Sequence, residues 1–209
     1  MLLAFDTATP RVTVALHDGS TVVAAWHSEE GLRHGEMLAP GIEAVLAEAG
    51  AGRRDVTAVA VGAGPGPFTG LRVGLVTART FGFALEVPVY AVCTLDVLAA
   101  EAVDAGLDDF VVATDARRKE VYLARYSAGR RLADPVVARP ADVATDEPVA
   151  GRGALLYPEA FPHAVQPELP RAAVLADVVT RERYELLDPD PLYLRRPDTM
   201  APRPPKKVS

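Results

Sequence analysis

Short apolar runs separated by turn-forming residues open the chain. Each run is four to six residues long and contains several branched side chains, which is typical of strands. The dipeptide Asp18-Gly19 between the second and third runs favours a tight hairpin. We therefore predict a three-stranded meander, and its first turn carries Asp6 and Thr7. The three strands are expected at residues 2–5, 11–16 and 21–26.

From residue 34 the apolar spacing becomes helical. Leu38, Ile42 and Val45 recur at intervals that place them on one helical face, so a helix is expected at 34–49. Pro40 and Gly41 weaken its early part, where the helix is expected to start late or to kink. Strands and helices then alternate. Strands are expected at 56–61 and 87–92, and helices at 69–84 (with Thr69 as N-cap) and 94–103.

The helix at 69–84 contains a line of small residues. Gly70, Gly74, Ala78 and Gly82 recur at every fourth position. Glycine inside a helix costs up to about 1 kcal/mol relative to alanine, so this line needs a reason. Two interpretations stay open at this point. Another helix could approach closely along the line, or the helix could pack tightly on the sheet of its own domain.

We adopt the first interpretation as a prediction. A helix-bundle interface would then use both helices, and an arginine in the first turn of the second helix would meet a carboxylate on this chain or on a partner. The expected interface residues are Leu38, Ile42, Val45, Gly70, Arg72, Gly74, Ala78 and Gly82.

The second half of the chain is strand-rich and then rich in proline. Strands are expected at 110–114, 120–126 and 130–137, and a last helix at 171–183. We divide the chain into an N-terminal domain (1–105), a smaller second domain (106–196) and a tail (197–209) with the composition of a disordered segment. By analogy, a meander followed by alternating helices and strands indicates an α/β fold of two ribonuclease-H-like domains of the actin type, the second degenerate.

Composition narrows the class of protein. With 49% hydrophobic and 24% charged residues, the chain is typical of a globular protein. Its formal net charge of −6 argues against an overall basic nucleic-acid surface, although local clusters such as 117–119 remain. Cys93 is the single cysteine, which excludes an intramolecular disulfide and suits a reducing, cytoplasmic compartment. No apolar stretch approaches the roughly 20 residues of a membrane span.

The stretch from Gly62 to Gly74 lies between an expected strand and an expected helix. Such a junction directs backbone N–H groups and the positive helix end towards one spot, where an anion can bind. The spacing matches neither a Walker A loop nor a Rossmann fingerprint, and two prolines remove donors. An anion or nucleotide site is nevertheless kept as a possibility. Its residues would be Asp6, Thr7, Gly64, Gly66 and Asp115.

Asp6 and Asp115 each end an expected strand and could face one another across a cleft. Two facing carboxylates could hold Mg²⁺ or act as an acid–base pair. The alternative is that both are turn or capping aspartates. The four histidines show no metal-ligand spacing, so no metal site is predicted from them.

The segment Gly64–Gly74 (Gly-Pro-Gly-Pro-Phe-Thr-Gly-Leu-Arg-Val-Gly) resembles the signature of the TsaB (YeaZ) family. Pro67 departs from it, because the family usually has serine there, and a role for a hydroxyl at that position is in doubt. Three further pieces are similar to the family and extend the match over nearly the whole chain. They are Phe5–Thr7, Asp115–Arg117 with Glu120–Tyr122, and Tyr193–Arg195.

The resemblance implies a bacterial cytoplasmic protein that acts in making N6-threonylcarbamoyladenosine, at the adenosine next to the anticodon in tRNAs. In that family the catalytic paralogue, TsaD, binds a metal through a His-x-x-x-His motif, and the corresponding region here, 92–98, contains no histidine. The resemblance thus implies a non-catalytic scaffold subunit with no catalytic residues and no activity of its own. It would pair with TsaD, form a homodimer when alone, be joined by the ATPase TsaE, and meet tRNA through the complex.

The resemblance implies no tightly bound cofactor, and ATP or ADP with Mg²⁺ only within the complex. Two other functions stay open. One is a peptidase-like or acyl-transfer enzyme that uses Asp6 and Asp115, which turnover lost on Asp6→Asn would support. The other is an actin-type nucleotide-binding sensor, which binding of ATP with Mg²⁺ to the isolated chain would support.

Overall fold

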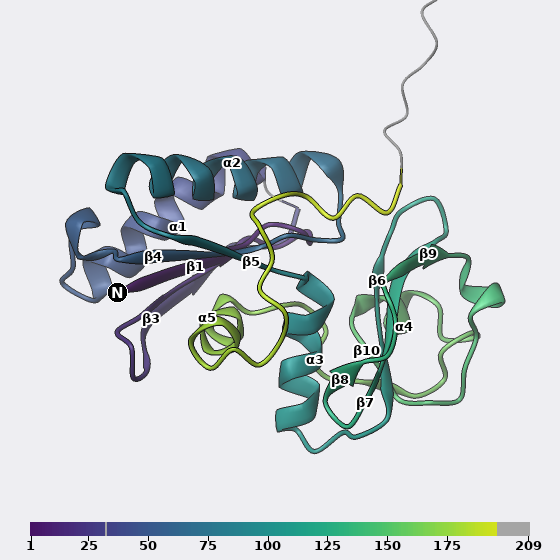
Figure 1. The fold of residues 1–209 in the computed structure, drawn as a ribbon. Helices are drawn as coiled ribbons and strands as arrows, with labels where there is room; N and C mark the ends of the chain where they lie inside the picture. The colour runs from purple at the N-terminus through teal and green to yellow at the C-terminus, as the bar shows by residue number, and fades with distance from the viewer. Residues whose placement is uncertain (32, 196–209) are drawn as a thin grey trace, which may run out of the picture.

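The computed structural model describes residues 1–31 and 33–195. Within these residues the chain forms two β-sheets with helices packed against them (Figure 1). The tail expected at 197–209 lies outside the described residues. None of the helices in the described part is long and apolar enough to cross a membrane.

The first sheet has the strand order β3-β2-β1-β4-β5. β1 runs antiparallel to β2 and parallel to β4, and β4 runs parallel to β5. The meander is confirmed, and the order is that of a ribonuclease-H-like domain. Since β1, β4 and β5 are parallel, Asp6, Gly62 and Val92 meet at one edge. The strands are β1 (Leu2–Asp6), β2 (Thr13–His17), β3 (Val22–His27), β4 (Ala58–Gly62) and β5 (Val89–Val92).

Helices cover both faces of this sheet. α1 (His34–Glu48) and α2 (Phe68–Leu85) lie on one face, and α5 (Ala172–Thr180) lies on the other (Figure 1). α1 begins at His34, so the proline and glycine in its first half do not delay it. Gly41 has a packing reason, because a Cβ there would overlap the ring of Trp26 on β3. α2 begins at Phe68 with Pro67 as N-cap, not at Thr69 as expected.

The second sheet is built on a hairpin. Its two strands β6 (Phe110–Asp115) and β7 (Val121–Ser127), both predicted as strands, run antiparallel and pair from Phe110 with Tyr126 to Asp115 with Val121. The expected single strand at 130–137 is wrong, because that stretch forms two short strands that pair with different parts of β7. The remaining pieces are too short to leave a periodic signal. They are β8 (Arg130–Arg131), β9 (Val136–Ala138), β10 (Val149–Ala150), β11 (Ala164–Val165), α4 (Arg152–Leu156) and the 3₁₀ turns at Arg53–Asp55 and Pro140–Asp142.

The two halves of the chain exchange helices. α3 (Thr94–Asp104) follows β5 but packs on the second sheet, where Leu95 and Leu98 share a core with Phe110. α5 belongs to the later part of the chain but packs on the first sheet, where Leu175 joins a core with strands β1 and β2. The expected boundary at 105/106 coincides with the end of α3, yet the exchange interlocks the two halves on either side of it.

A buried polar cluster strengthens this junction. The carboxylate of Asp96, in the first turn of α3, accepts hydrogen bonds from the Tyr126 hydroxyl at 2.7 Å and from Arg131 Nη1 at 2.6 Å. Burial raises the pKa of Asp96, and both partners oppose that shift. The cluster ties α3 to β7 and β8, since a buried carboxylate is stable only when paired.

Candidate functional site

The edge where β1, β4 and β5 end carries Asp6, which is fully buried. Its Oδ1 accepts the backbone N–H of Ala8 and its Oδ2 accepts the hydroxyl of Thr94, both at 2.7 Å. Burial raises the pKa of Asp6 to about 6, although both hydrogen bonds favour the ionised form. Gly62 lies over the carboxylate, and a Cβ there would overlap it. The Asp6 side chain thus connects the β1–β2 turn to the start of α3 at this edge of the sheet.

Asp6 and Asp115 do not form the facing pair considered from the sequence. Asp115 ends β6 and binds its own turn, accepting the backbone N–H of Arg117 at 2.7 Å and lying 3.3 Å from the guanidinium of that arginine. Because Asp6 is buried beneath Gly62, it cannot reach a cleft. Within residues 1–31 and 33–195 no group of three or more His, Cys, Asp or Glu is placed to hold a metal ion.

The loop between β4 and α2 (residues 63–67), here called the glycine loop, packs closely against its neighbours. The carbonyl oxygen of Gly64 accepts a hydrogen bond from the backbone N–H of Thr94 at 2.7 Å. The backbone N–H of Gly64 donates a hydrogen bond to the Thr94 hydroxyl at 3.3 Å. Gly66 lies against the β1–β2 turn, and a Cβ added at Gly66 would overlap the carbonyl of Ala8. The residues at this edge therefore do not fit a nucleotide phosphate with Mg²⁺ held in the actin manner. Gly64 and Gly66 are packing residues, and the anion site considered for them is not formed here.

The line of small residues on α2 faces the sheet of its own domain. The Thr7 hydroxyl donates to the carbonyl of Gly70 at 2.8 Å. A Cβ at Gly70 or Gly74 would overlap Thr7, and one at Gly82 would overlap Val89. The prediction that Gly70, Gly74 and Gly82 meet another helix is therefore wrong, and close packing on the sheet is the reason for them.

The same correction applies to Ala78 and Val45, which are completely buried in the core. Leu38 and Ile42 on α1 are also buried, but they line the groove between α1 and α2, so their place at an interface stays a prediction. Of the eight expected interface residues, only Arg72 is exposed. Both helices were identified correctly, but on α2 the residues facing the sheet were chosen instead of those on its outer side.

The outward side of the same two helices carries an apolar surface. Val76 and Phe83, two turns apart on α2, are 61% and 88% exposed. Beside them a groove of about 400 Å³ runs between α1 and α2, with Ala39, Val73 and Ala84 among its lining residues. We call Val76, Phe83 and this groove the α1–α2 face. The seven-residue spacing of Val76 and Phe83 was the sequence signal for it.

The C-terminal segment crosses the start of α2. Arg72 lies over the ring of Phe68, 3.7 Å from its centroid, and its Nε donates to the hydroxyl of Tyr193 at 3.3 Å. Phe68 and Tyr193 stack with ring centroids 5.2 Å apart. Within this chain Arg72 therefore contacts two aromatic side chains, and a carboxylate on a partner stays a prediction. Arg79, farther along α2, forms an ion pair with Asp190.

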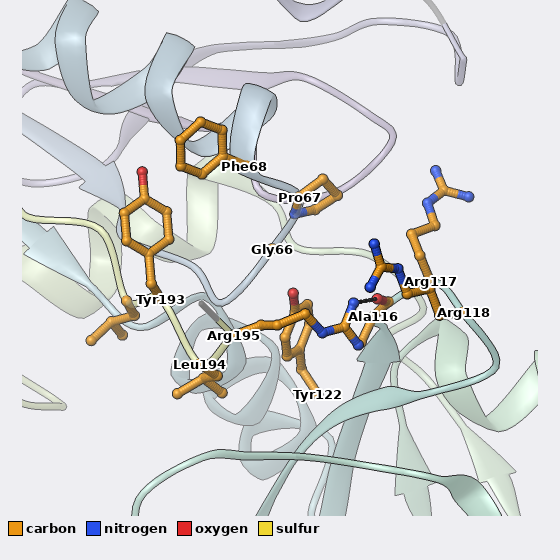
Figure 2. Close-up of a pocket in the computed structure, with 11 residues that line it drawn as sticks. Gly66, Pro67, Phe68, Ala116, Arg117, Arg118, Tyr122, Tyr193, Leu194 and Arg195 are labelled. Atoms are coloured by element: carbon orange, nitrogen blue, oxygen red, sulfur yellow. Dashed lines mark hydrogen bonds between the residues drawn. The ribbon is translucent and has the colours of Figure 1, made fainter. Parts of the chain in front are cut away.

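A cleft of about 410 Å³ opens between the glycine loop, the β6–β7 turn and the C-terminal segment (Figure 2). Arg117 and Arg118 enter it from the turn, and Arg195 enters from the C-terminal segment. Arg195 pairs with Glu120 and donates to the carbonyl of Ala116 at 3.3 Å. Of the residues considered for an anion site, only Gly66 lines this cleft. The sequence showed Arg117 and Arg118 within a local basic cluster but did not locate a cavity.

Comparison with families and curated proteins gives a consistent result. A family model described as TsaD, tRNA N6-adenosine threonylcarbamoyltransferase, matches residues 28–180. An uncharacterised protein of Mycobacterium tuberculosis is 42% identical over 202 residues, covering 94% of this chain and 92% of that protein. The tRNA threonylcarbamoyladenosine biosynthesis protein TsaB of Escherichia coli is 39% identical over 127 residues, covering 60% of this chain and 54% of that protein.

Solved structures agree over almost the full length. YeaZ from Pseudomonas aeruginosa is 33% identical with a TM-score of 0.76, and the match covers 92% of this chain and 99% of that one. A second structure, of an uncharacterised protein with similarity to peptidase YeaZ from the same organism, is also 33% identical and has a TM-score of 0.79.

Proposed function

Because the chain belongs to the TsaB (YeaZ) family, we propose that it takes part in making N6-threonylcarbamoyladenosine in tRNA, as a cytoplasmic, non-catalytic subunit. Its role would be to dock the catalytic subunit of the TsaD type and hold it in an active arrangement. The α1–α2 face is the single observation that carries this proposal.

The composition of that face supports a docking role. An exposed phenylalanine and valine beside an apolar groove are the kind of patch that marks protein–protein contact in soluble proteins. Both helices are anchored from below by fully packed residues, so the face is rigid before a partner arrives. A rigid apolar helix pair suits a partner that presents a similar pair, which applies both to a paralogue and to a second copy of this chain.

The chemistry of the sheet edge supports a subunit without catalysis of its own. Asp6, on which an enzymatic function would rest, is buried and has both oxygens hydrogen-bonded. Asp115 is tied to its own turn. The same contacts argue against tight nucleotide binding by the isolated chain, and we propose that ATP or ADP enters only with the assembled complex, which includes a TsaE-type ATPase.

Co-purification tests this proposal. The tagged chain, expressed with the TsaD-type and TsaE-type proteins of its own organism, should retain the TsaD-type protein through gel filtration. The reconstituted mixture should modify tRNA, and each protein alone should not. Failure to retain the TsaD-type protein, or modification that proceeds equally well without this chain, would overturn the proposal.

A further inference from the structure

The cleft shown in Figure 2 combines positive charge with exposed rings, on a chain whose net charge is −6. Among the described residues that line it, three are arginines and none is a carboxylate. Two neighbouring carboxylates, Asp115 and Glu120, form ion pairs with Arg117 and Arg195 respectively. A guanidinium has five N–H donors, so an arginine with one carboxylate partner keeps donors for a second anion.

The backbone of the β6–β7 turn holds two of these arginines in an uncommon conformation. Arg117, Arg118 and Lys119 have φ values of 60°, 53° and 62°. The backbone of three consecutive non-glycine residues therefore lies in the left-handed region. The turn is closed by the N–H of Glu120 donating to Arg117 O at 3.0 Å. Such residues cost free energy and concentrate at functional sites. Both arginines of this turn line the cleft.

An aromatic pair stands on the opposite side of the cleft. Phe68 and Tyr193 stack on each other, and they remain 38% and 39% exposed. Half-exposed rings next to arginines form the set of groups that binds unpaired nucleotides, because a base stacks on a ring while its phosphate meets a guanidinium.

We propose that this cleft binds a single-stranded segment of RNA, with Arg117 and Arg118 at the phosphates and the Phe68–Tyr193 pair beneath a base. The inference rests on the proposed function, because that function brings the chain to a tRNA whose modified adenosine lies next to the anticodon, within an unpaired loop. It goes beyond that function by giving this chain its own RNA contact. A free nucleotide is the poorer occupant, since the neighbouring glycine loop is packed shut and Asp6 is buried.

Fluorescence anisotropy of the full chain alone, with a labelled seven-nucleotide single-stranded RNA of anticodon-loop sequence at low salt, tests the proposal. Replacing both turn arginines (Arg117→Gln with Arg118→Gln) should weaken binding at least about tenfold. It should also reduce the slope of log Kd against log salt by about 1.4, the value for two lost phosphate contacts on a single strand. Tyr193→Leu should weaken binding about fivefold or more and leave the slope unchanged.

The matched control is Arg54→Gln with Arg130→Gln. Both arginines are exposed, and neither of them lines the cleft or the groove between α1 and α2. This control should bind RNA within about twofold of the unchanged chain. Thermal melts of all variants confirm folding, and Tyr193→Leu keeps the test decisive if the turn variant does not fold.

Three results would overturn the proposal: no saturable RNA binding by the unchanged chain, equal weakening in the control variant, or displacement of the RNA by ATP at equal concentration. No catalytic subunit is present in this assay. Its failure would leave the proposed docking function to the co-purification experiment, and the two outcomes stay distinguishable.

Discussion

The hydroxyl of Thr94 donates a hydrogen bond to Oδ2 of Asp6 at 2.7 Å, and neither side chain has any exposed surface. Asp6 ends the central strand of the first sheet, and Thr94 begins the helix that packs on the second. The bond therefore joins the two halves of the molecule. Because Thr94 also holds the glycine loop through Gly64, one side chain fixes three segments at this edge.

Replacing Thr94 with valine should destabilise the protein by about 1–3 kcal/mol, because the buried carboxylate loses its side-chain donor while the side-chain volume is kept. Urea denaturation followed by circular dichroism measures the change. Thr80→Val is the matched control, since the Thr80 hydroxyl bonds only to the carbonyl of Val76 on the exposed side of α2, and its effect should stay within about 0.5 kcal/mol. Equal effects of the two variants would contradict the assigned role of Thr94.

The pKa of Asp6 predicts a specific pH dependence. Burial raises it from 3.8 to about 6, so between these pH values the folded state binds a proton that the unfolded chain has released. The Asp6 contribution to the free energy of unfolding should therefore fall as pH rises from about 4 to about 6, and stay constant above that. Relative to Asp6→Asn, which does not titrate, the loss should be on the order of 3 kcal/mol.

Denaturation of both proteins at pH 4, 5, 6 and 7 measures this difference. Other carboxylates titrate in the same range, but they are common to both proteins and cancel in the comparison. Stability curves that run parallel over the whole range would show that Asp6 is not the buried acid described here.

Adding a methyl group at the small-residue line of α2 should damage the fold and not only an interface. Gly70→Ala and Gly74→Ala each place a Cβ against Thr7, and each should cost about 1–3 kcal/mol in the isolated chain. Gly35→Ala on α1 is the control, because a Cβ there meets only Val73, at 4.0 Å, and alanine is the better helix former. Its thermal midpoint should rise or stay unchanged, whereas the midpoints of the two α2 variants should fall.

Charges on the α1–α2 face should prevent docking without unfolding the chain. Val76→Glu and Phe83→Glu each put a carboxylate on an exposed position, so the thermal midpoint should hardly change. Retention of the TsaD-type protein in co-purification should fall by at least about tenfold, because docking would bury an unpaired charge. Leu132→Glu is the control, since Leu132 is 63% exposed on the second half of the molecule. Undiminished retention by both α2 variants would place the interface elsewhere.

The local elements and the family could be inferred from the order of residues alone. Runs of alternating and helical period are set by neighbouring residues, so the meander, the helices and the β6–β7 hairpin could be predicted to within a few residues. The glycine-loop signature identified the family because its residue types are demanded by one packing arrangement: Gly66 must lie against Ala8, and Gly70 against Thr7. Strands β10 and β11 could not be predicted, since two residues carry no period.

Which side of a helix packs on the sheet, and which side stays exposed, depends on the tertiary structure. Helix α2 has small residues on one side and Val76 and Phe83 on another, and its period does not say which side meets the sheet. The sheet makes that choice, because only the glycine side lets the helix backbone reach Thr7. In the same way, an aspartate at a strand end can bind a metal ion or can be a buried structural residue, and the residues that cover it make the difference. Gly62 and Thr94, which are distant from Asp6 in the sequence, cover its carboxylate, so Asp6 is a structural residue.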